Sequence, residues 1–289
     1  MMRVSTAGMN SRMISQALDV QTKYYKALET QSSGLKSTSL SGLDGQSGSV
    51  INLKSDIAAS ENLESQATGI GSELEITYSS MNGIEDIVEK ALTSYSAAMD
   101  GTVTDISSSI QSSSGWLSDI ITLLNTQYAG SYVFSGGDSQ SQTYTSNGSG
   151  GYDYTGGASL KTLMIDGDQS LDYGALGNES VFGDIISALS AMSDPAADKT
   201  TLSSSFQTLS NATETLGSLM ETVSGQSNTL EKIVDGQTSF QLYANDALES
   251  LTKEDVGTAS AETAAWETVL QASYAALSSL DKINILNYL

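Results

Sequence analysis

The residue types that carry most enzymatic chemistry are missing or uninformative in this sequence. It contains no cysteine and no histidine, so it has no thiolate nucleophile and lacks the side chain that most often acts as a general base or zinc ligand. Acidic residues are abundant, 34 against 12 basic ones, and among so many carboxylates a close pair is most simply a solvated acidic face. We therefore predict a protein that is not an enzyme and that binds no cofactor and no metal.

Three kinds of short motif deserve a chemical test, and each has a simpler explanation. Asp166-Gly-Asp168 resembles the start of a calcium loop, but the twelve-residue EF-hand pattern is missing, so we predict a turn between strands. Gly148-Ser-Gly-Gly151 lacks the Lys-Ser/Thr pair of a phosphate-binding loop. Triplets of the N-glycosylation type begin at Asn147, Asn178 and Asn211, and this pattern is frequent by chance.

The charge balance excludes several classes of partner. The formal net charge is −22, whereas nucleic-acid binding depends on a basic surface and anionic lipid attracts basic segments. No apolar run approaches the ~20 residues of a membrane span, and the first residues lack the apolar core of a secretory signal peptide. We expect no nucleic acid, no membrane insertion and no use of the general secretory route.

Any functional surface of this protein must be carried by long helical segments. Apolar residues recur at helical spacing over 3–37, and a break rich in serine and glycine follows at 38–48. Helical pattern returns from about 50 to 127, with a stop at Asp100-Gly101, because glycine commonly follows the last helical residue. The first seam of this segment consists of Leu74, Tyr78, Met81, Val88, Leu92, Tyr95 and Met99, and the second of Val103, Ile106, Ile110, Leu117, Ile120 and Leu124. Packing within one chain explains such seams best.

The middle of the chain changes character. Twelve of the 26 glycines lie in 130–183. Between them are short runs such as Tyr132–Phe134, Tyr152–Tyr154 and Leu160–Ile165, which predict short strands joined by tight turns.

Helical pattern resumes near 181 and is expected to last to the end, interrupted only at 252–257. The single proline, Pro195, agrees with long helices. One apolar register joins Leu202, Phe206, Leu209, Leu216, Met220, Val223, Leu230 and Val234. This register slips by one residue at Phe240.

The predicted fold is mainly α: a long antiparallel helical rod or coiled coil made from both chain ends, with a small β-rich insertion in the middle. We predict three domains. Residues 1–48 with 252–289 form a terminal helical assembly domain, 49–129 with 184–251 form a helical rod domain, and 130–183 form a β-rich outward insertion.

The two ends of the chain are unusually apolar. One stripe joins Met13, Ala17, Val20, Tyr24 and Ala27, and a parallel stripe joins Ile14, Leu18, Tyr25 and Leu28. The sequence closes on Tyr288-Leu289, where a polar tail is more usual. We therefore favour burial between copies over burial within one chain. The predicted assembly interface comprises Arg3, Met13, Leu18, Tyr24, Leu28, Trp266, Leu270, Tyr274, Leu277, Ile283, Leu286 and Leu289.

Four motifs, in order along the chain, resemble those of the bacterial flagellin family, which includes filament flagellins and hook-filament junction proteins (hook-associated protein 3). They are Met2-Arg-Val-Ser-Thr6, Leu28-Glu-Thr-Gln-Ser-Ser-Gly34, Ala129-Gly-Ser-Tyr-Val-Phe-Ser-Gly136 and the tail from Leu270-Gln-Ala-Ser-Tyr274 to Ile285-Leu-Asn-Tyr-Leu289. The junction-protein group is the more similar. The stretch Gly42–Gly48 departs from the family's Asp-Asp-Pro or Asp-Asp-Ala motif.

The resemblance implies a structural subunit of the extracellular bacterial flagellum. It implies secretion through the flagellar type III system with an export chaperone, and polymerisation through paired terminal helices. Its partners would be other copies of itself and the neighbouring axial proteins, the hook-side junction protein and filament flagellin. The favoured role is the junction protein. A filament-forming flagellin is the alternative. A less favoured one is a surface-binding or adhesion module that uses Tyr132, Tyr144, Tyr152, Tyr154 and Tyr173 to recognise a glycan or a host surface.

Overall fold

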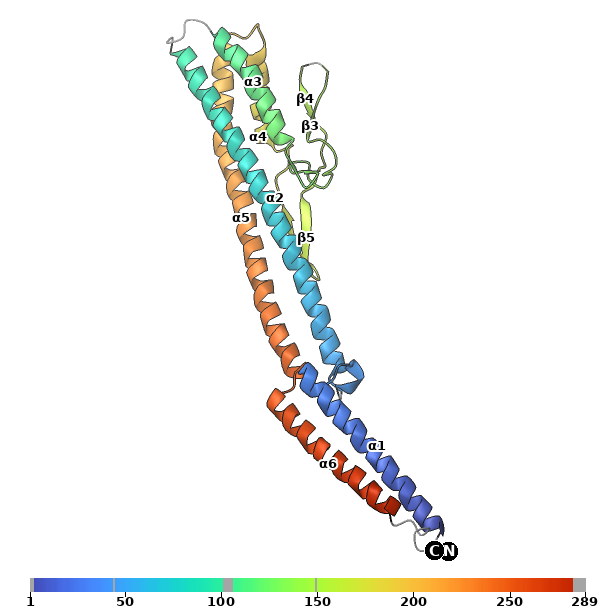
Figure 1. The fold of residues 1–289 in the computed structure, drawn as a ribbon. Coiled ribbons are helices and arrows are strands. Elements are labelled where there is room, and N and C mark those ends of the chain that lie inside the picture. The colour runs from blue at the N-terminus through green and yellow to red at the C-terminus, as the bar shows by residue number, and fades with distance from the viewer. Residues whose placement is uncertain (1–2, 44, 101–105, 149, 283–289) are drawn as a thin grey trace. The chain divides into compact units, whose positions relative to one another are not determined.

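The computed structural model describes residues 3–43, 45–100, 106–148 and 150–282 (Figure 1). The chain divides into two compact units. The terminal unit consists of residues 1–59 and 240–289, and the central unit of residues 60–239. Each is described by itself below.

The secondary structure elements of the terminal unit are all helices in its described part. It contains α1 (Arg3–Ser33), the 3₁₀ turn η1 (Leu40–Gly42) and α6 (Val256–Lys282), together with the first residues of α2 (Ser47–Met99) and the last of α5 (Lys199–Thr252). The predicted break at 38–48 is confirmed, because only η1 lies between α1 and α2. The interruption predicted from residue 252 is confirmed as well, since α5 ends at Thr252 and α6 begins at Val256.

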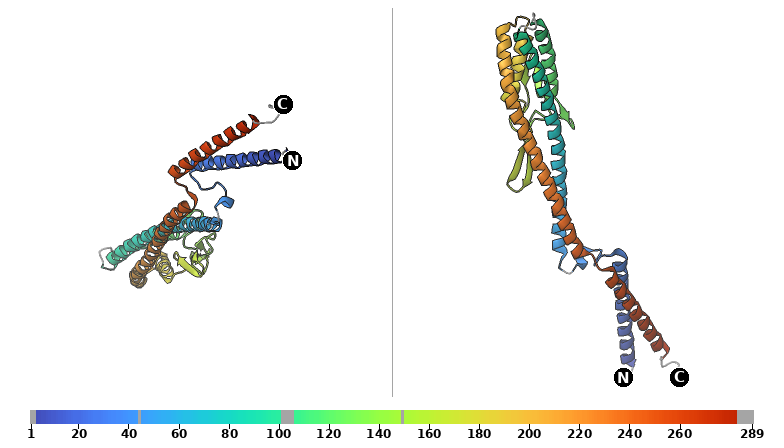
Figure 2. Two further views of the ribbon diagram at one scale, coloured as in Figure 1. Left: turned by 90° about the horizontal axis from the view of Figure 1, so that it is seen from below. Right: turned by 90° about the vertical axis from the view of Figure 1, so that its left-hand side faces the viewer.

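The central unit is built on the long helices α2 and α5, which run side by side in Figures 1 and 2. Two shorter helices, α3 (Ser107–Leu124) and α4 (Ser180–Ser193), pack beside them. The Ser60 hydroxyl of α2 donates to the Gln237 carbonyl of α5 (3.3 Å). Residues near 78 line the same hollow as residues near 224, so α2 and α5 are antiparallel. The predicted fold class, mainly α with a small β-rich insertion, is confirmed.

The insertion consists of three separate antiparallel hairpins in the described residues. They are β1–β2 (Gln127–Tyr128 and Ser131–Tyr132), β3–β4 (Tyr144–Ser146 and Tyr152–Tyr154) and β5–β6 (Lys161–Asp166 and Gln169–Tyr173). The sequence Asp166-Gly-Asp168 lies at the β5–β6 turn, as predicted, and Gly167 takes a positive φ of 46° there.

One apolar core runs through the central unit. Phe134, which follows β2, and Phe182 of α4 are fully buried, and their rings meet edge to face with centroids 5.6 Å apart. Tyr95 of α2 is also buried and shares a hydrogen bond with the Ser113 hydroxyl of α3. Burial raises the pKa of Tyr95 to about 12, so this phenol stays protonated at neutral pH. These long-range contacts tie the insertion to α4 and tie α3 to α2.

The expectation of continuous helix from 181 to residue 252 is wrong at one place. Helix α4 ends at Ser193, and α5 starts at Lys199. Pro195 explains the break, because a residue before proline is driven out of the helical region, and Asp194 is extended (ψ 124°). Asp198 then opens α5, since its carboxylate accepts hydrogen bonds from the backbone amides of Thr200 and Thr201 (3.0 and 2.9 Å). These bonds, led by that from Thr201, lower the pKa of Asp198.

Three residues assigned to the apolar seams lie at the surface. Tyr78 and Met99 of α2 and Phe240 of α5 are exposed. The intervening seam residues Leu74 and Met81 are fully buried. Helix α5 runs unbroken through the predicted slip at Phe240, as expected for a phase shift that changes local winding only.

The β1–β2 turn holds a strained residue. Ala129 and Gly130 occupy its two central positions with φ of 47° and 83°, the backbone signs of a type I′ turn, which prefers Asn-Gly. Ala129→Asn should therefore raise the free energy of unfolding by about 1 kcal/mol, as measured by urea denaturation. Ala129→Val should lower it, since a branched side chain tolerates positive φ poorly. Equal stability of the two variants would contradict the assignment of strain.

Candidate assembly surface

Helices α1 and α6 form an antiparallel pair within one chain, here called the terminal helix pair (Figure 1). Small buried residues face one another along it: Ala17 and Ala27 of α1, and Ala259 and Thr263 of α6. Small side chains allow two helix backbones to approach closely.

Polar and cationic contacts fix the register of the pair. The Lys23 ammonium lies over the Trp266 ring, 4.8 Å from its centroid, an attractive cation–π arrangement. The Gln31 amide donates to the Ser260 hydroxyl (3.2 Å). By sequence α1 carries four basic and two acidic residues and α6 one basic and three acidic, so the two helices have opposite net charge.

A short backbone bridge closes the helix pair at one end. Leu35, just after α1, pairs with Lys253, just after α5. The Lys36 amide donates to the Thr252 carbonyl (2.8 Å), and the Glu254 amide donates to the Gly34 carbonyl (2.9 Å). The Lys36 ammonium also donates to the Ser250 carbonyl (2.7 Å) near the end of α5, where a cation is favoured by the helix dipole. The connector after α1 is thus joined to the connector before α6.

The residues of the predicted interface fall into three groups. Met13, Tyr24, Trp266, Leu270 and Leu277 are half-buried; together with the buried residues above they lie on the stripes along which α1 and α6 face each other. Leu18, Leu28 and Tyr274 are exposed at 57%, 41% and 48%. Arg3 begins α1 but its side chain lies outside the described part, as do Ile283, Leu286 and Leu289 entirely.

The outward stripe of α1 continues beyond the predicted residues. Ile14 and Tyr25 are exposed like Leu18 and Leu28, and these four residues are here called the outer α1 face. Met9, Val256 and Val269 are also exposed on the terminal helices, as are Leu242 and Tyr243 near the end of α5. The sequence did not predict that Leu242 and Tyr243 are exposed, because the helical spacing of their neighbours Ala244 and Ala247 drew the predicted buried face of α5 to those alanines.

Exposed apolar side chains are concentrated in the terminal unit. Among the described residues sixteen large apolar side chains are exposed, and thirteen of these belong to the terminal unit although the central unit is the larger one. Clustered exposed apolar residues mark interaction surfaces in soluble proteins, whereas scattered ones do not. The terminal unit is therefore the part of the described chain that exposes most of its large apolar side chains.

Charge is distributed in the opposite way. The terminal unit contains eight basic and eleven acidic residues, a net charge of −3, and the central unit four basic and 23 acidic, a net charge of −19. A nearly neutral, apolar surface can associate with its like, while a strongly acidic surface repels its like. Association through the terminal unit is therefore favoured over association through the central unit.

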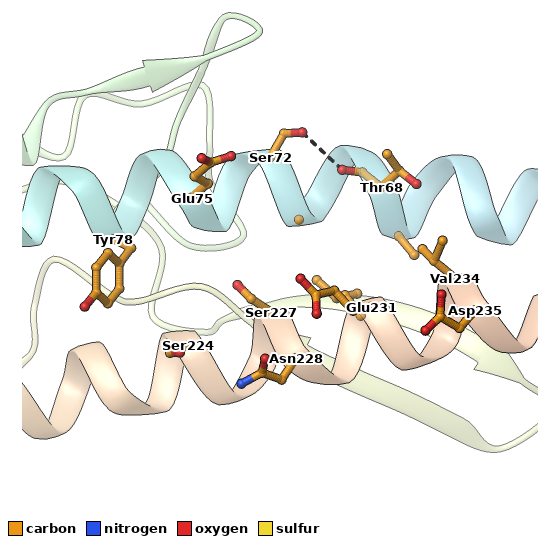
Figure 3. Close-up of a pocket in the computed structure, with 13 residues that line it drawn as sticks. Thr68, Ser72, Glu75, Tyr78, Ser224, Ser227, Asn228, Glu231, Val234 and Asp235 are labelled. Atoms are coloured by element: carbon orange, nitrogen blue, oxygen red, sulfur yellow. Dashed lines mark hydrogen bonds between the residues drawn. The ribbon is translucent and has the colours of Figure 1, made fainter.

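A hollow with a volume of about 710 Å³ lies between α2 and α5 in the central unit (Figure 3). Small residues, among them Ala67, Gly71 and Ser227, occupy its walls where larger seam residues would close the gap. Tyr78 points from α2 toward α5, and Glu231 points from α5 toward α2 (Figure 3). No basic side chain is among the residues that line it, so the hollow is unsuited to an anionic ligand.

Metal-type clusters and membrane-spanning helices are both absent from the part of the chain that the structure describes. None of its acidic residues gather into a group of three or more that could hold a metal ion. No helix in this part is both long enough and apolar enough to cross a bilayer. The feature that calls for a function is the apolar terminal unit.

Comparisons with known proteins give structural similarity only. No protein-family model and no curated protein matches the sequence. Among solved structures, the chain is similar to a candidate flagellar hook-associated protein from Vibrio parahaemolyticus, with 16% identity and a TM-score of 0.46 over 73% of this chain and 95% of that one. It is also similar to FlgL from Bacillus cereus, with 18% identity and a TM-score of 0.44 over 71% of this chain and 96% of that one.

Proposed function

We propose that this protein is a structural subunit of the extracellular bacterial flagellum that polymerises through its terminal helices, in the role of a hook-filament junction protein. The observation that carries the proposal is the concentration of exposed apolar side chains on the terminal unit, the outer α1 face above all. The family motifs in the sequence place this surface in a flagellar setting.

The energetics of the terminal helix pair favour assembly. The pair meets through small residues such as Ala17, Ala27 and Ala259, so the larger side chains Leu18, Tyr25 and Leu28 stay in water. Burial of apolar surface contributes about 25 cal/mol per Å², and full burial of one such side chain contributes about 1.5–3 kcal/mol. A neighbouring copy that covers the outer α1 face recovers this energy, which offsets the entropy lost on ordering the chain ends.

The composition of the chain and its apolar terminal unit also suit export followed by assembly. A chain without cysteine and with one proline refolds without disulfide exchange and with few slow isomerisation steps, which suits passage through a narrow type III channel in an unfolded state. An export chaperone would cover the apolar terminal unit until neighbouring axial proteins replace it.

Deletion of the gene in the source bacterium tests the role. Loss of a junction protein should leave hooks that cannot hold filament subunits, so that flagellin monomers accumulate in the culture medium and motility is lost. Immunoblotting of the medium and electron microscopy of the cells measure both effects, and a plasmid copy of the gene should reverse them.

Two other outcomes have definite meanings. Bare hooks without flagellin in the medium would show that the protein is the filament subunit, the alternative given above. Normal filaments and normal swimming would contradict a flagellar role. Growth of long filaments from seeds by the purified protein would also favour the filament subunit over the junction protein.

A further inference from the structure

A second hollow in the central unit has the composition of a ligand site. Its volume is about 320 Å³, at the lower end of the ~300–1,000 Å³ typical of small-molecule sites. Helix α2 forms the floor with Gln66, Gly69 and Glu73, which share one helix face because they are three and four residues apart. The turn of β1–β2 forms one wall, and hairpin β5–β6, which lies beside α2 in Figure 1, forms the other.

The walls contribute two tyrosines and a set of polar atoms. Tyr128 and Tyr173 are half-buried, and within the described residues neither hydroxyl makes a hydrogen bond. The Thr162 hydroxyl donates to the Asp172 carboxylate (2.7 Å) and keeps lone pairs free to accept. A mere packing gap is usually lined by apolar groups, whereas this hollow combines aromatic surface with hydrogen-bonding groups from three elements.

Electrostatics limit the charge of a ligand. Glu73 forms an ion pair with Lys161 of β5, and both side chains are largely buried, so neither needs a charged ligand. Burial, with the negative charge of Glu73 as the smaller cause, raises the pKa of Tyr173, which keeps this hydroxyl a donor. The net charge of −19 on the central unit repels anions. An uncharged ligand with both apolar faces and hydroxyl groups fits these conditions.

We propose that this hollow, between α2, the β1–β2 turn and hairpin β5–β6, binds a neutral saccharide of one or two sugar rings. The apolar face of a pyranose packs on a tyrosine ring, and its hydroxyls bond to Tyr128, Tyr173 and the amide of Gln66. Two of the other tyrosines considered from the sequence have different roles. Tyr144 donates to the Gly177 carbonyl (2.7 Å) and Tyr154 to the Gly157 carbonyl (2.6 Å), so both hold the insertion together.

Gly69 allows the site to be blocked without damage to the fold. A Cβ atom added at Gly69 would meet no atom within 4 Å, and the same holds for Gly71, which lines the α2–α5 hollow instead. Gly69→Leu should fill the saccharide site, and Gly71→Leu is its matched control on the same helix. Both variants should keep the far-ultraviolet circular dichroism of the parent, because both remove a helix-destabilising glycine.

Saturation-transfer NMR on the full-length protein tests the proposal. Glucose, galactose, N-acetylglucosamine, maltose, cellobiose and lactose serve as probes at millimolar concentration, with sialyllactose as the anionic comparison. At least one neutral sugar should bind, with affinity reduced at least tenfold by Gly69→Leu, several-fold by Tyr173→Phe, and unchanged by Gly71→Leu. Absence of transfer to every neutral sugar, equal binding by the Gly69→Leu variant, or sialyllactose binding as tightly as lactose would each overturn it.

Discussion

Removal of residues 1–37 and 262–289 should convert the protein into a soluble, folded monomer that no longer polymerises. The cut removes α1 and most of α6, and with them the outer α1 face and Tyr274. The apolar core of the central unit consists of buried residues between Ala67 and Leu230, so none of it is lost. Sedimentation velocity measures the oligomeric state, and seeded growth followed by electron microscopy measures assembly.

The fold of the truncated protein needs its own measurement. Its circular dichroism should remain strongly helical, and its thermal transition should remain cooperative, because α2, α3, α4 and α5 are intact. Full-length protein under the same conditions should add to the ends of the seeds. Polymerisation of the truncated protein would contradict the assembly surface, while a folded monomer would support it.

Sequence periodicity predicts the elements of this fold well where one helix face is apolar. The end of α2 at Met99 lies next to the predicted stop at Asp100-Gly101, because a local signal, glycine after an apolar residue, decides it. The break at 194–198 depends on a single proline that the long helical pattern on both sides obscures. The capping carboxylates Asp198 and Asp255 open α5 and α6 through local hydrogen bonds, and their sequence signal is weak.

The candidate surfaces were harder to predict, because they depend on which elements meet. Both stripes of α1 are apolar, and only the position of α6 decides that Tyr24 faces a helix while Leu18 faces water. The contact of Lys23 with Trp266 joins residues from opposite ends of the chain, so no local sequence pattern predicts it. The saccharide hollow likewise combines three elements that are distant in sequence. From the sequence alone, its floor residue Gly69 predicts nothing more than a locally less stable helix.

A single charge on the outer α1 face should strongly weaken assembly. Leu18 is 57% exposed, so Leu18→Glu should leave the terminal helix pair intact. In a polymer the variant loses the burial of one leucine, about 1.5–3 kcal/mol, and must also desolvate a carboxylate. We expect the critical concentration for addition to seeds to rise about a hundredfold or more, equivalent to about 3 kcal/mol.

Met164→Glu is the matched control for this effect. Met164 of β5 is 61% exposed, nearly the same as Leu18, but it belongs to the central unit. Because the central unit already carries a net charge of −19, one more carboxylate on an exposed side chain should change neither stability nor critical concentration by more than about twofold. If Met164→Glu weakened assembly as strongly as Leu18→Glu, added charge alone would explain both results and the outer α1 face would lose its assigned role. Loss of assembly in Leu18→Glu alone, with the circular dichroism of both variants unchanged, assigns the contact to α1, since both substitutions place the same charge at an apolar position of similar exposure.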